Sequence, residues 1–285
     1  MSVYQEEIDR LFSKAERQLI KSASKPLPRN VHRLRTAIRR AEAVLMEVPP
    51  KLSRNQRKLV KLLAHLRRRA GKLRDIDVQI AALRGLKVSD EPGRKTQMIA
   101  ALTNLRNTRE KKLVKVLDRR SVQEVSKRLK RAHREMNSED IPDPLALASQ
   151  IFERLAKANQ TLSETSLHQY RINGKRARYV AELAGDRPEA QKLVGQLKQM
   201  QDVLGEWHDW LTLRNTVARL TDSGQNSAML AALNNITRAK FREALQTVST
   251  TKLALLPRTP SAKPSMSTAL SAKSAPVPRA TAAVA

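Results

Sequence analysis

Apolar residues recur at the spacing of an α-helix along most of the chain, and no segment shows the strict alternation of apolar and polar positions expected of a β-strand. Short segments rich in proline, glycine and small polar residues interrupt this periodicity. They predict helix ends at 25–28, 49–50, 89–93, 137–144, 185–188 and 223–224. The pattern therefore predicts an all-α fold.

The predicted helices carry two motifs, each present twice and in the same order. The first motif is a histidine, an arginine three residues later and then a basic pair after three more positions; it occupies 32–40 and 168–176. The second motif begins at a glycine and reaches an aspartate four residues later; it occupies 71–77 and 205–211. We interpret the repeat as an internal duplication. It predicts two pseudo-symmetric helical bundles of about four helices each.

The end of the chain differs in composition from the rest. The helical domain is predicted to span 1–250, with its first half at about 1–137 and its second at about 144–250. Beyond it, alanine, serine, proline and threonine dominate, and the segment has five basic residues and no acidic one. Such a composition buries too little apolar surface to offset the entropy lost on ordering. We predict that 251–285 is a disordered, basic C-terminal tail.

The charge balance indicates the class of partner. The chain has 55 lysine and arginine residues against 27 acidic residues, a net charge of +28. That excess is larger than solubility requires and repels itself in a compact state. On a helix, the basic residues of the first motif form a stripe beside the apolar face, and those of the second fall at the same angles. The pattern predicts a polyanionic partner.

Both motif histidines are predicted to lie in the first turn of a helix. Asn30 and Ser166 each precede a motif histidine by two residues and are favoured N-cap residues. The free N–H groups and the positive dipole end of a first turn favour phosphate. His32 and His168 are therefore expected to meet a phosphate together with backbone and guanidinium groups.

The candidate anion-binding residues are the cations and histidines of the two stripes, extended by two further cations on the helix that follows the first motif. Arg178 adds a charge to the second stripe where the first has Glu42, so we expect the second stripe to bind more strongly. The full set is His32, Arg35, Arg39, Arg40, Arg68, Lys72, His168, Arg171, Lys175, Arg176 and Arg178.

Three aspartates in the second motif are interpreted as structural support. Asp75, Asp77 and Asp209 lie among arginine and lysine residues that neutralise a carboxylate and compete with a metal ion. Asp77 falls on the apolar face of its helix, where it needs a partner, and the second half has Leu211 at that position. Because the chain has no nucleotide-binding loop, zinc-protease motif or nucleophile elbow, we predict a non-enzymatic protein without metal or other cofactor.

At these motifs the chain resembles the CHAD family, the conserved-histidine α-helical domain, in which a repeated HxxRxxx[KR]R helix is followed by a helix with an RD or HD pair. The pairs here are Arg74-Asp75 and His208-Asp209, and the likeness covers about residues 5–248. The resemblance implies two four-helix bundles with a basic surface that binds inorganic polyphosphate. Many relatives are fused to a CYTH triphosphatase domain, but its ExExK signature is absent here, so the chain looks like a stand-alone member.

Other functions stay open on the sequence alone. The net charge and the basic tail also fit a nonspecific DNA-binding or nucleoid-associated protein. The resemblance also allows an interaction protein of polyphosphate or polyester storage granules, and it names no protein partner. The absence of cysteine suits a reducing compartment. With no secretory signal and no apolar run of about 18 residues, we predict a cytoplasmic protein without a membrane span.

Overall fold

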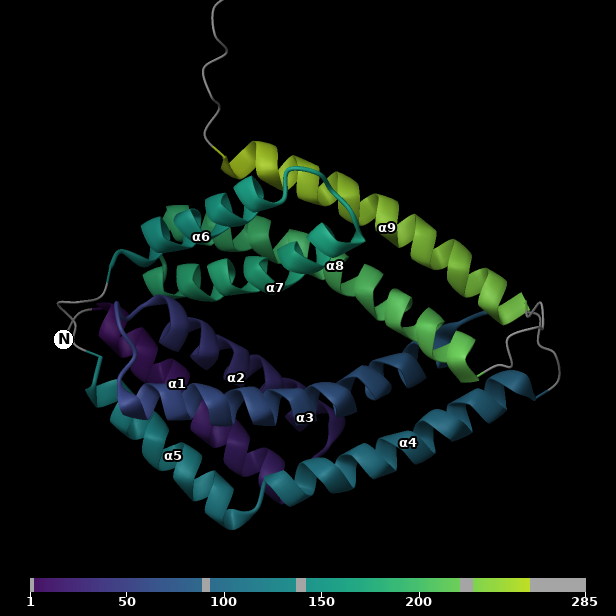
Figure 1. The fold of residues 1–285 in the computed structure, drawn as a ribbon, viewed down its shortest axis with the longest axis horizontal. Coiled ribbons are helices and arrows are strands. Elements are labelled where there is room, and N and C mark those ends of the chain that lie inside the picture. Colours follow the sequence, from purple (N-terminus) through teal and green to yellow (C-terminus); the bar gives the residue numbers. More distant parts are fainter. Residues whose placement is uncertain (1–2, 89–92, 137–141, 221–227, 257–285) are drawn as a thin grey trace, which may run out of the picture.

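The computed structural model describes residues 3–88, 93–136, 142–220 and 228–256, and within these ranges every regular element is helical (Figure 1). The all-α prediction is therefore confirmed. The first half contains α1 (Val3–Ser24), α2 (Pro28–Glu47), α3 (Arg54–Gly85), α4 (Arg94–Val116) and α5 (Arg119–Arg134). The second half contains α6 (Pro144–Ala158), α7 (Glu164–Ala181), the 3₁₀ turn η2 (Glu182–Ala184), α8 (Pro188–Leu220) and α9 (Ala228–Leu255).

The observed helix ends show which local sequence signals start or end a helix in this chain. Each predicted break falls at or between helix ends or in a segment outside the described residues. Two further breaks were not predicted, one between α4 and α5 and one between α6 and α7. At the first, Asp118 caps α5 by accepting a hydrogen bond of 2.6 Å from the Ser121 N–H. This cap was readable in the sequence as an aspartate followed by helical periodicity.

The predicted N-caps of the two motif helices are wrong. Helix α2 begins at Pro28, and the Asn30 side chain instead donates to the Lys25 carbonyl, at 2.8 Å, beyond the end of α1. Helix α7 is capped by Ser163, with Ser166 in the third helical position of a reciprocal capping box. Both helices therefore start earlier than predicted. The two motif histidines lie beyond the first four N–H groups, so their own backbone N–H groups are not available to a phosphate.

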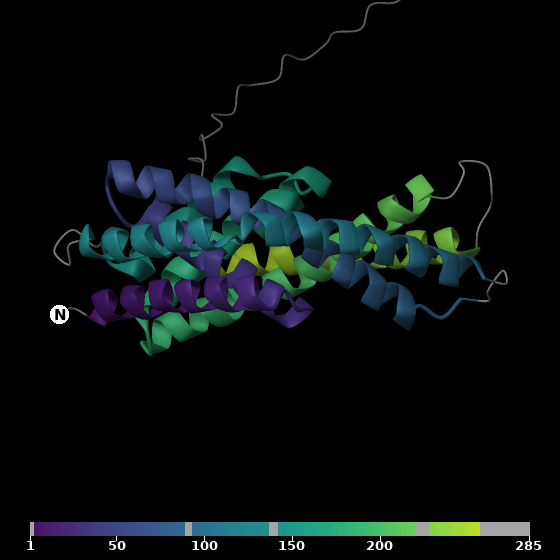
Figure 2. The same cartoon turned by 90° about the horizontal axis from the view of Figure 1, so that it is seen from below.

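Three apolar clusters hold the helices together. The first is built mainly from the first half, with Leu183 of η2 added to it, and the second is built from α6, α7, α8 and α9. The third, which was not predicted, joins the ends of α3 and α4 to those of α8 and α9 (Figures 1 and 2). Its members are Ile76, Ile80, Leu83, Leu86, Met98, Leu102, Leu213, Val217, Met229 and Leu233. The two halves thus share a core at the end remote from α1, α5 and α6.

The start of the predicted tail is corrected by the structure. Helix α9 continues to Leu255, so helix occupies the first residues of the segment predicted to be disordered. The reason is packing: Thr251 is buried, and Leu255 and Leu256 contact the second apolar cluster. The remainder of the predicted tail, from residue 257, lies outside the described residues.

Candidate anion-binding site

The packing of α2 against α7 brings the two predicted basic stripes together. We call Arg35 and Arg39 of α2, with Arg171 and Lys175 of α7, the central cation cluster. The four side chains are close enough for each arginine to act electrostatically on Lys175. Arg39 and Lys175 also line a pocket of about 290 Å³ between α2, α3 and α7. The two positive stripes, carried by separate helices, therefore converge.

Mutual repulsion and burial shift the ionisation of this cluster. Burial, and then Arg171, Arg39 and Arg35, lower the pKa of Lys175 to about 6. The pKa of Arg39 falls to about 10, again through burial and then through Arg35 and Arg171. Both shifts have the sign expected when cations are desolvated beside like charges. An anion bound among these groups would oppose the repulsion and raise both pKa values.

Several guanidinium nitrogens in the cluster are buried without an acceptor. The Nε atoms of Arg35, Arg39 and Arg171 have no hydrogen-bond partner among the residues that the structure describes. A buried donor left unpaired costs free energy, and more so when the group is charged. These arginines are therefore poised to donate to an anion that supplies oxygen acceptors.

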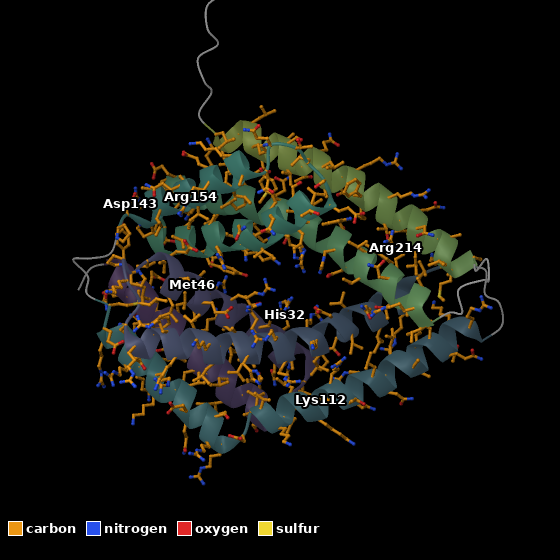
Figure 3. All side chains as sticks on the ribbon, viewed as in Figure 1. His32, Met46, Lys112, Asp143, Arg154 and Arg214 are labelled. Carbon is orange, nitrogen blue, oxygen red and sulfur yellow. The ribbon has the colours of Figure 1, made fainter. Side chains whose placement is uncertain are left out.

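The motif histidines lie at the margins of the cluster. His32 is exposed and lies in the central region of the molecule in Figure 3. Burial and then Arg74 of α3 lower its pKa. The His168 ring lies 5.6 Å from the His208 ring of α8. Burial, followed by Arg171, lowers the pKa of His208 to about 3, so this pair is neutral near pH 7 and available for hydrogen bonding without adding charge.

Each of the three predicted support aspartates lies close to an arginine. Asp75 Oδ1 lies 3.8 Å from Nη2 of Arg35. Burial is the main cause that raises the pKa of Asp209, while Arg171 opposes it. Asp77 Oδ1 accepts a 2.8 Å hydrogen bond from Nε of Arg106, which joins α3 to α4. Asp75 and Asp209 therefore temper the positive charge of the cluster, whereas Asp77 is engaged elsewhere.

Three predicted binding residues are paired with carboxylates at the contact between the halves. Arg40 donates two hydrogen bonds to Glu182, of 2.8 and 3.3 Å. Arg178 lies 3.4 Å from the same carboxylate. Arg176 lies 3.6 Å from Glu47 of α2. The pairs of Arg40 and Arg176 link α2 to η2 and α7, whereas the pair of Arg178 lies within the second half. Arg178 also acts electrostatically on Lys175, so it borders the central cation cluster.

The two predicted extension residues lie on the exposed side of α3. Arg68 and Lys72 are both exposed, and Arg68 is seven residues before Asp75, so the two share a helical face. Asp75 lies beside Arg35 of the central cation cluster. This face of α3 therefore connects the cluster with the exposed residues Arg68 and Lys72.

Sequence reasoning left two neighbouring residues out of the binding set. Arg74 acts electrostatically on His32, and His208 lies beside His168. Both belong to the RD and HD pairs of the second motif, so their matching positions in the two halves were the signal that could have identified them. His133, by contrast, lies between α1 and α5, with Nε2 3.3 Å from Gln5 and Nδ1 3.7 Å from Asp9.

The described part of the chain shows neither a metal-binding cluster nor a membrane-spanning helix. No three His, Asp or Glu side chains there are grouped in a way that would hold a metal ion. None of the helices in these ranges combines the length and the apolar character needed to cross a bilayer. The chemistry of the site is therefore described by its cations, imidazoles and carboxylates.

Comparison with known proteins gives a consistent family and fold. The sequence profile of the CHAD domain matches residues 5–218. The crystal structure of the CHAD domain from the plant Ricinus communis is similar, with a TM-score of 0.61 and 16% identity, covering 89% of this chain and 90% of that chain. PptA from Streptomyces chartreusis is similar with a TM-score of 0.56 and 15% identity, covering 87% of this chain and 98% of that chain. No curated protein sequence matches.

Proposed function

The chain belongs to the CHAD domain family, and we propose that it binds inorganic polyphosphate through the central cation cluster without catalysing a reaction on it. The observation that carries the proposal is the set of buried, unpaired guanidinium Nε atoms of Arg35, Arg39 and Arg171. A protein that folds with such donors facing Lys175 retains an unfavourable charge arrangement. Binding of an anionic ligand gives a physical reason for this arrangement of charges.

The arrangement suits a narrow, linear polyanion. Polyphosphate presents phosphate groups in a single row, with no bases to be read, so recognition needs convergent cations and little else. Arginine offers a planar fork to two oxygens and lysine a single point charge. His32 and the pair of His168 with His208 lie at the margins of the cluster, where neutral imidazoles can donate further hydrogen bonds to phosphate oxygens.

The proposal extends to where the protein acts. A polyphosphate-binding chain would be held wherever that polymer accumulates, and we propose cytoplasmic polyphosphate granules as that place. Binding without catalysis is tested by incubating long-chain polyphosphate with the protein and following its length on gels together with released orthophosphate. An unchanged length distribution is expected. Progressive shortening of the polymer by the unmodified chain, but not by the central-cluster variant described next, would refute the non-catalytic part of the proposal.

Binding itself is tested with the full chain at physiological salt, using long-chain polyphosphate and duplex DNA at equal phosphate concentration. The central-cluster variant changes all four members of the central cation cluster, Arg35, Arg39, Arg171 and Lys175, to Gln. The matched control removes four exposed cations of the second half by changing Lys157, Lys192, Arg238 and Arg242 to Gln.

The two variants lose the same formal charge, so a difference between them reports the position of the removed cations and not their number. We expect the central-cluster variant to lose polyphosphate binding by at least about 100-fold, because more than one charge-assisted hydrogen bond is removed. The control should stay within a few-fold of the unmodified chain. Equal losses in the two variants would mean that diffuse charge explains binding and that the central cluster is not the site.

A further inference from the structure

A second basic surface lies on α4 and α5, away from the central cation cluster. Exposed cations without an ion pair among the described residues follow the end of α4 and the length of α5. We define the α4–α5 basic surface by these residues: Lys111, Lys112, Lys115, Arg119, Arg120, Lys127 and Arg134. Figure 2 shows α4 and α5 following one another along the near side of the molecule.

The fold separates this surface from the first site. Helix α5 packs against α1 and α3, and α4 packs against α3, whereas the cluster lies where α2 meets α7. In Figure 1, α4 and α5 lie at the edge of the molecule remote from α6 and α9, and Figure 3 places Lys112 on that edge. A ligand on α4 and α5 would therefore leave the central cluster uncovered.

Acidic residues do little to neutralise the surface. Residues 111–134 contain ten lysines and arginines but only two acidic residues, Asp118 and Glu124. Asp118 caps α5 through Ser121, and Glu124 pairs with Arg128. The positive charge of the defined surface is therefore balanced mainly by ions from the solvent. Binding of a polyanion releases such ions.

A groove at one edge of this surface adds a further cation, Arg69 of α3. His65 and Arg69 of α3 and Lys112 and Lys115 of α4 line a pocket of about 590 Å³, with Ser121 of α5. Its remaining walls are apolar side chains, Leu62, Leu66, Val116 and Val125. The positive surface thus spans three helices and is broad, in contrast to the convergent, partly buried cluster between α2 and α7.

The breadth and composition of the surface select one kind of polyanion. The apolar face of α5, with Val125, Leu129 and Ala132, is buried in the first-half core, so it is not free to enter a lipid bilayer. Residues 111–134 contain no phenylalanine, tyrosine or tryptophan on which single-stranded bases could stack. We propose that the α4–α5 basic surface binds the phosphate backbone of double-stranded nucleic acid, independently of base sequence.

This binding mode has a measurable signature in its salt dependence. Each phosphate neutralised by a lysine or arginine releases condensed counterions from the duplex, and the logarithm of the binding constant falls with the logarithm of salt concentration by about 0.9 per phosphate. The surface variant changes Lys112, Lys115, Arg120 and Lys127 to Gln in the full chain. The second-half control described above removes an equal charge, and both variants keep the C-terminal segment, so its contribution cancels.

Duplex binding is measured for the unmodified chain and for the surface, central-cluster and control variants over a series of salt concentrations. We expect the salt slope of the surface variant to fall by about 3 to 4 and its affinity at physiological salt by at least about tenfold. The control and central-cluster variants should each change the slope by less than about 1. The polyphosphate affinity of the surface variant should stay within a few-fold of the unmodified chain.

Four outcomes would overturn the inference. Equal slopes for the surface and control variants would show that duplex binding follows net charge alone. Loss of duplex binding in the central-cluster variant would assign the duplex to the other site. A parallel loss of polyphosphate binding in the surface variant would make the surface an extension of the polyphosphate track, and tight binding to phosphatidylserine vesicles in place of the duplex would assign it to membranes. Circular dichroism melts confirm that each variant is folded, and failure of the polyphosphate proposal leaves this test intact.

Discussion

The two halves of the chain place the same motif in different surroundings. His32 of the first copy is exposed, whereas His168 of the second is partly buried beside His208. Arg35 faces the carboxylate of Asp75 at 3.8 Å and keeps 17% of its side-chain surface exposed, whereas the matching Arg171 is only 7% exposed. Equal spacing along the chain therefore does not give equal electrostatics. The second copy has the larger cost of desolvation.

The second motif differs in the same manner. Asp77 is held by Arg106, which also pairs with Glu110, whereas Leu211 packs against the second apolar cluster. One half thus fixes this helix by an ion network and the other by apolar contact. The halves therefore carry cations at matching motif positions but differ in the residues that support them.

The largest effect is expected at the ionic support of the first half. Asp77→Ala removes one of the two carboxylate partners of Arg106, a cation that is only 18% exposed, so we expect the free energy of unfolding to fall by about 1 to 3 kcal/mol. Polyphosphate affinity should change by less than about threefold, because Asp77 is engaged with α4 rather than with the cluster.

Chemical denaturation and a binding titration measure the two quantities. Asp77→Asn is the matched control, since it keeps the side-chain size and an oxygen acceptor. Unchanged stability in Asp77→Ala would contradict the structural role of this residue.

The next effect compares the contributions of the two basic stripes to polyphosphate affinity. Arg171→Gln should weaken polyphosphate binding by about 10- to 100-fold, whereas Arg35→Gln should weaken it by about a third to a half as much in free energy, because Arg35 is more exposed than Arg171. Isothermal titration at fixed salt measures both. If Arg35→Gln has the larger effect, the burial of the second stripe does not determine affinity.

Replacement of Lys175 is expected to have a smaller effect on stability, and it should raise the free energy of unfolding, unlike Asp77→Ala. Lys175 ionises with a pKa of about 6 in the unliganded fold, so folding opposes its charge, and the unfolded chain binds more protons between that pKa and the normal lysine value. Stability should therefore rise with pH above about 6 for this group. Lys175→Met should raise the free energy of unfolding by about 1 to 2 kcal/mol at pH 6 while weakening polyphosphate binding.

A denaturation series from pH 5.5 to 8 follows this contribution. Lys192→Met, at an exposed position of α8, is the control and should leave stability unchanged. A Lys175→Met protein that is less stable than the unmodified chain at pH 6 would show that the lysine is satisfied in the fold.

The smallest effect is the uptake of protons on binding. The pKa of Lys175 is about 6 without a ligand, and we expect bound polyphosphate to raise it, so that binding near pH 7.5 takes up protons and affinity falls by less than about tenfold per pH unit as pH rises. His32, His168 and His208 have lowered pKa values and are neutral there. Calorimetry in two buffers of different ionisation enthalpy counts the protons. Equal apparent enthalpies in the two buffers would contradict the assignment.

The sequence could predict the elements of the cluster because they depend on local spacing. Helical angle alone places Arg35 and Arg39 on one stripe, and Arg171 and Lys175 on the matching stripe. It could not predict that Arg40 would pair with Glu182, 142 residues away, or that Asn30 would cap the preceding helix instead of starting its own. Those outcomes depend on which helices pack together. A cation's role was therefore decided by neighbours distant in sequence.

The third apolar cluster gives the duplicated chain a property that neither half has alone. Its buried side chains are drawn from α3 and α4 on one side and from α8 and α9 on the other, so cutting the chain between the halves would leave each fragment with one wall of a shared interior. Two such fragments are expected to recombine in trans. Each half would then serve as the folding partner of the other.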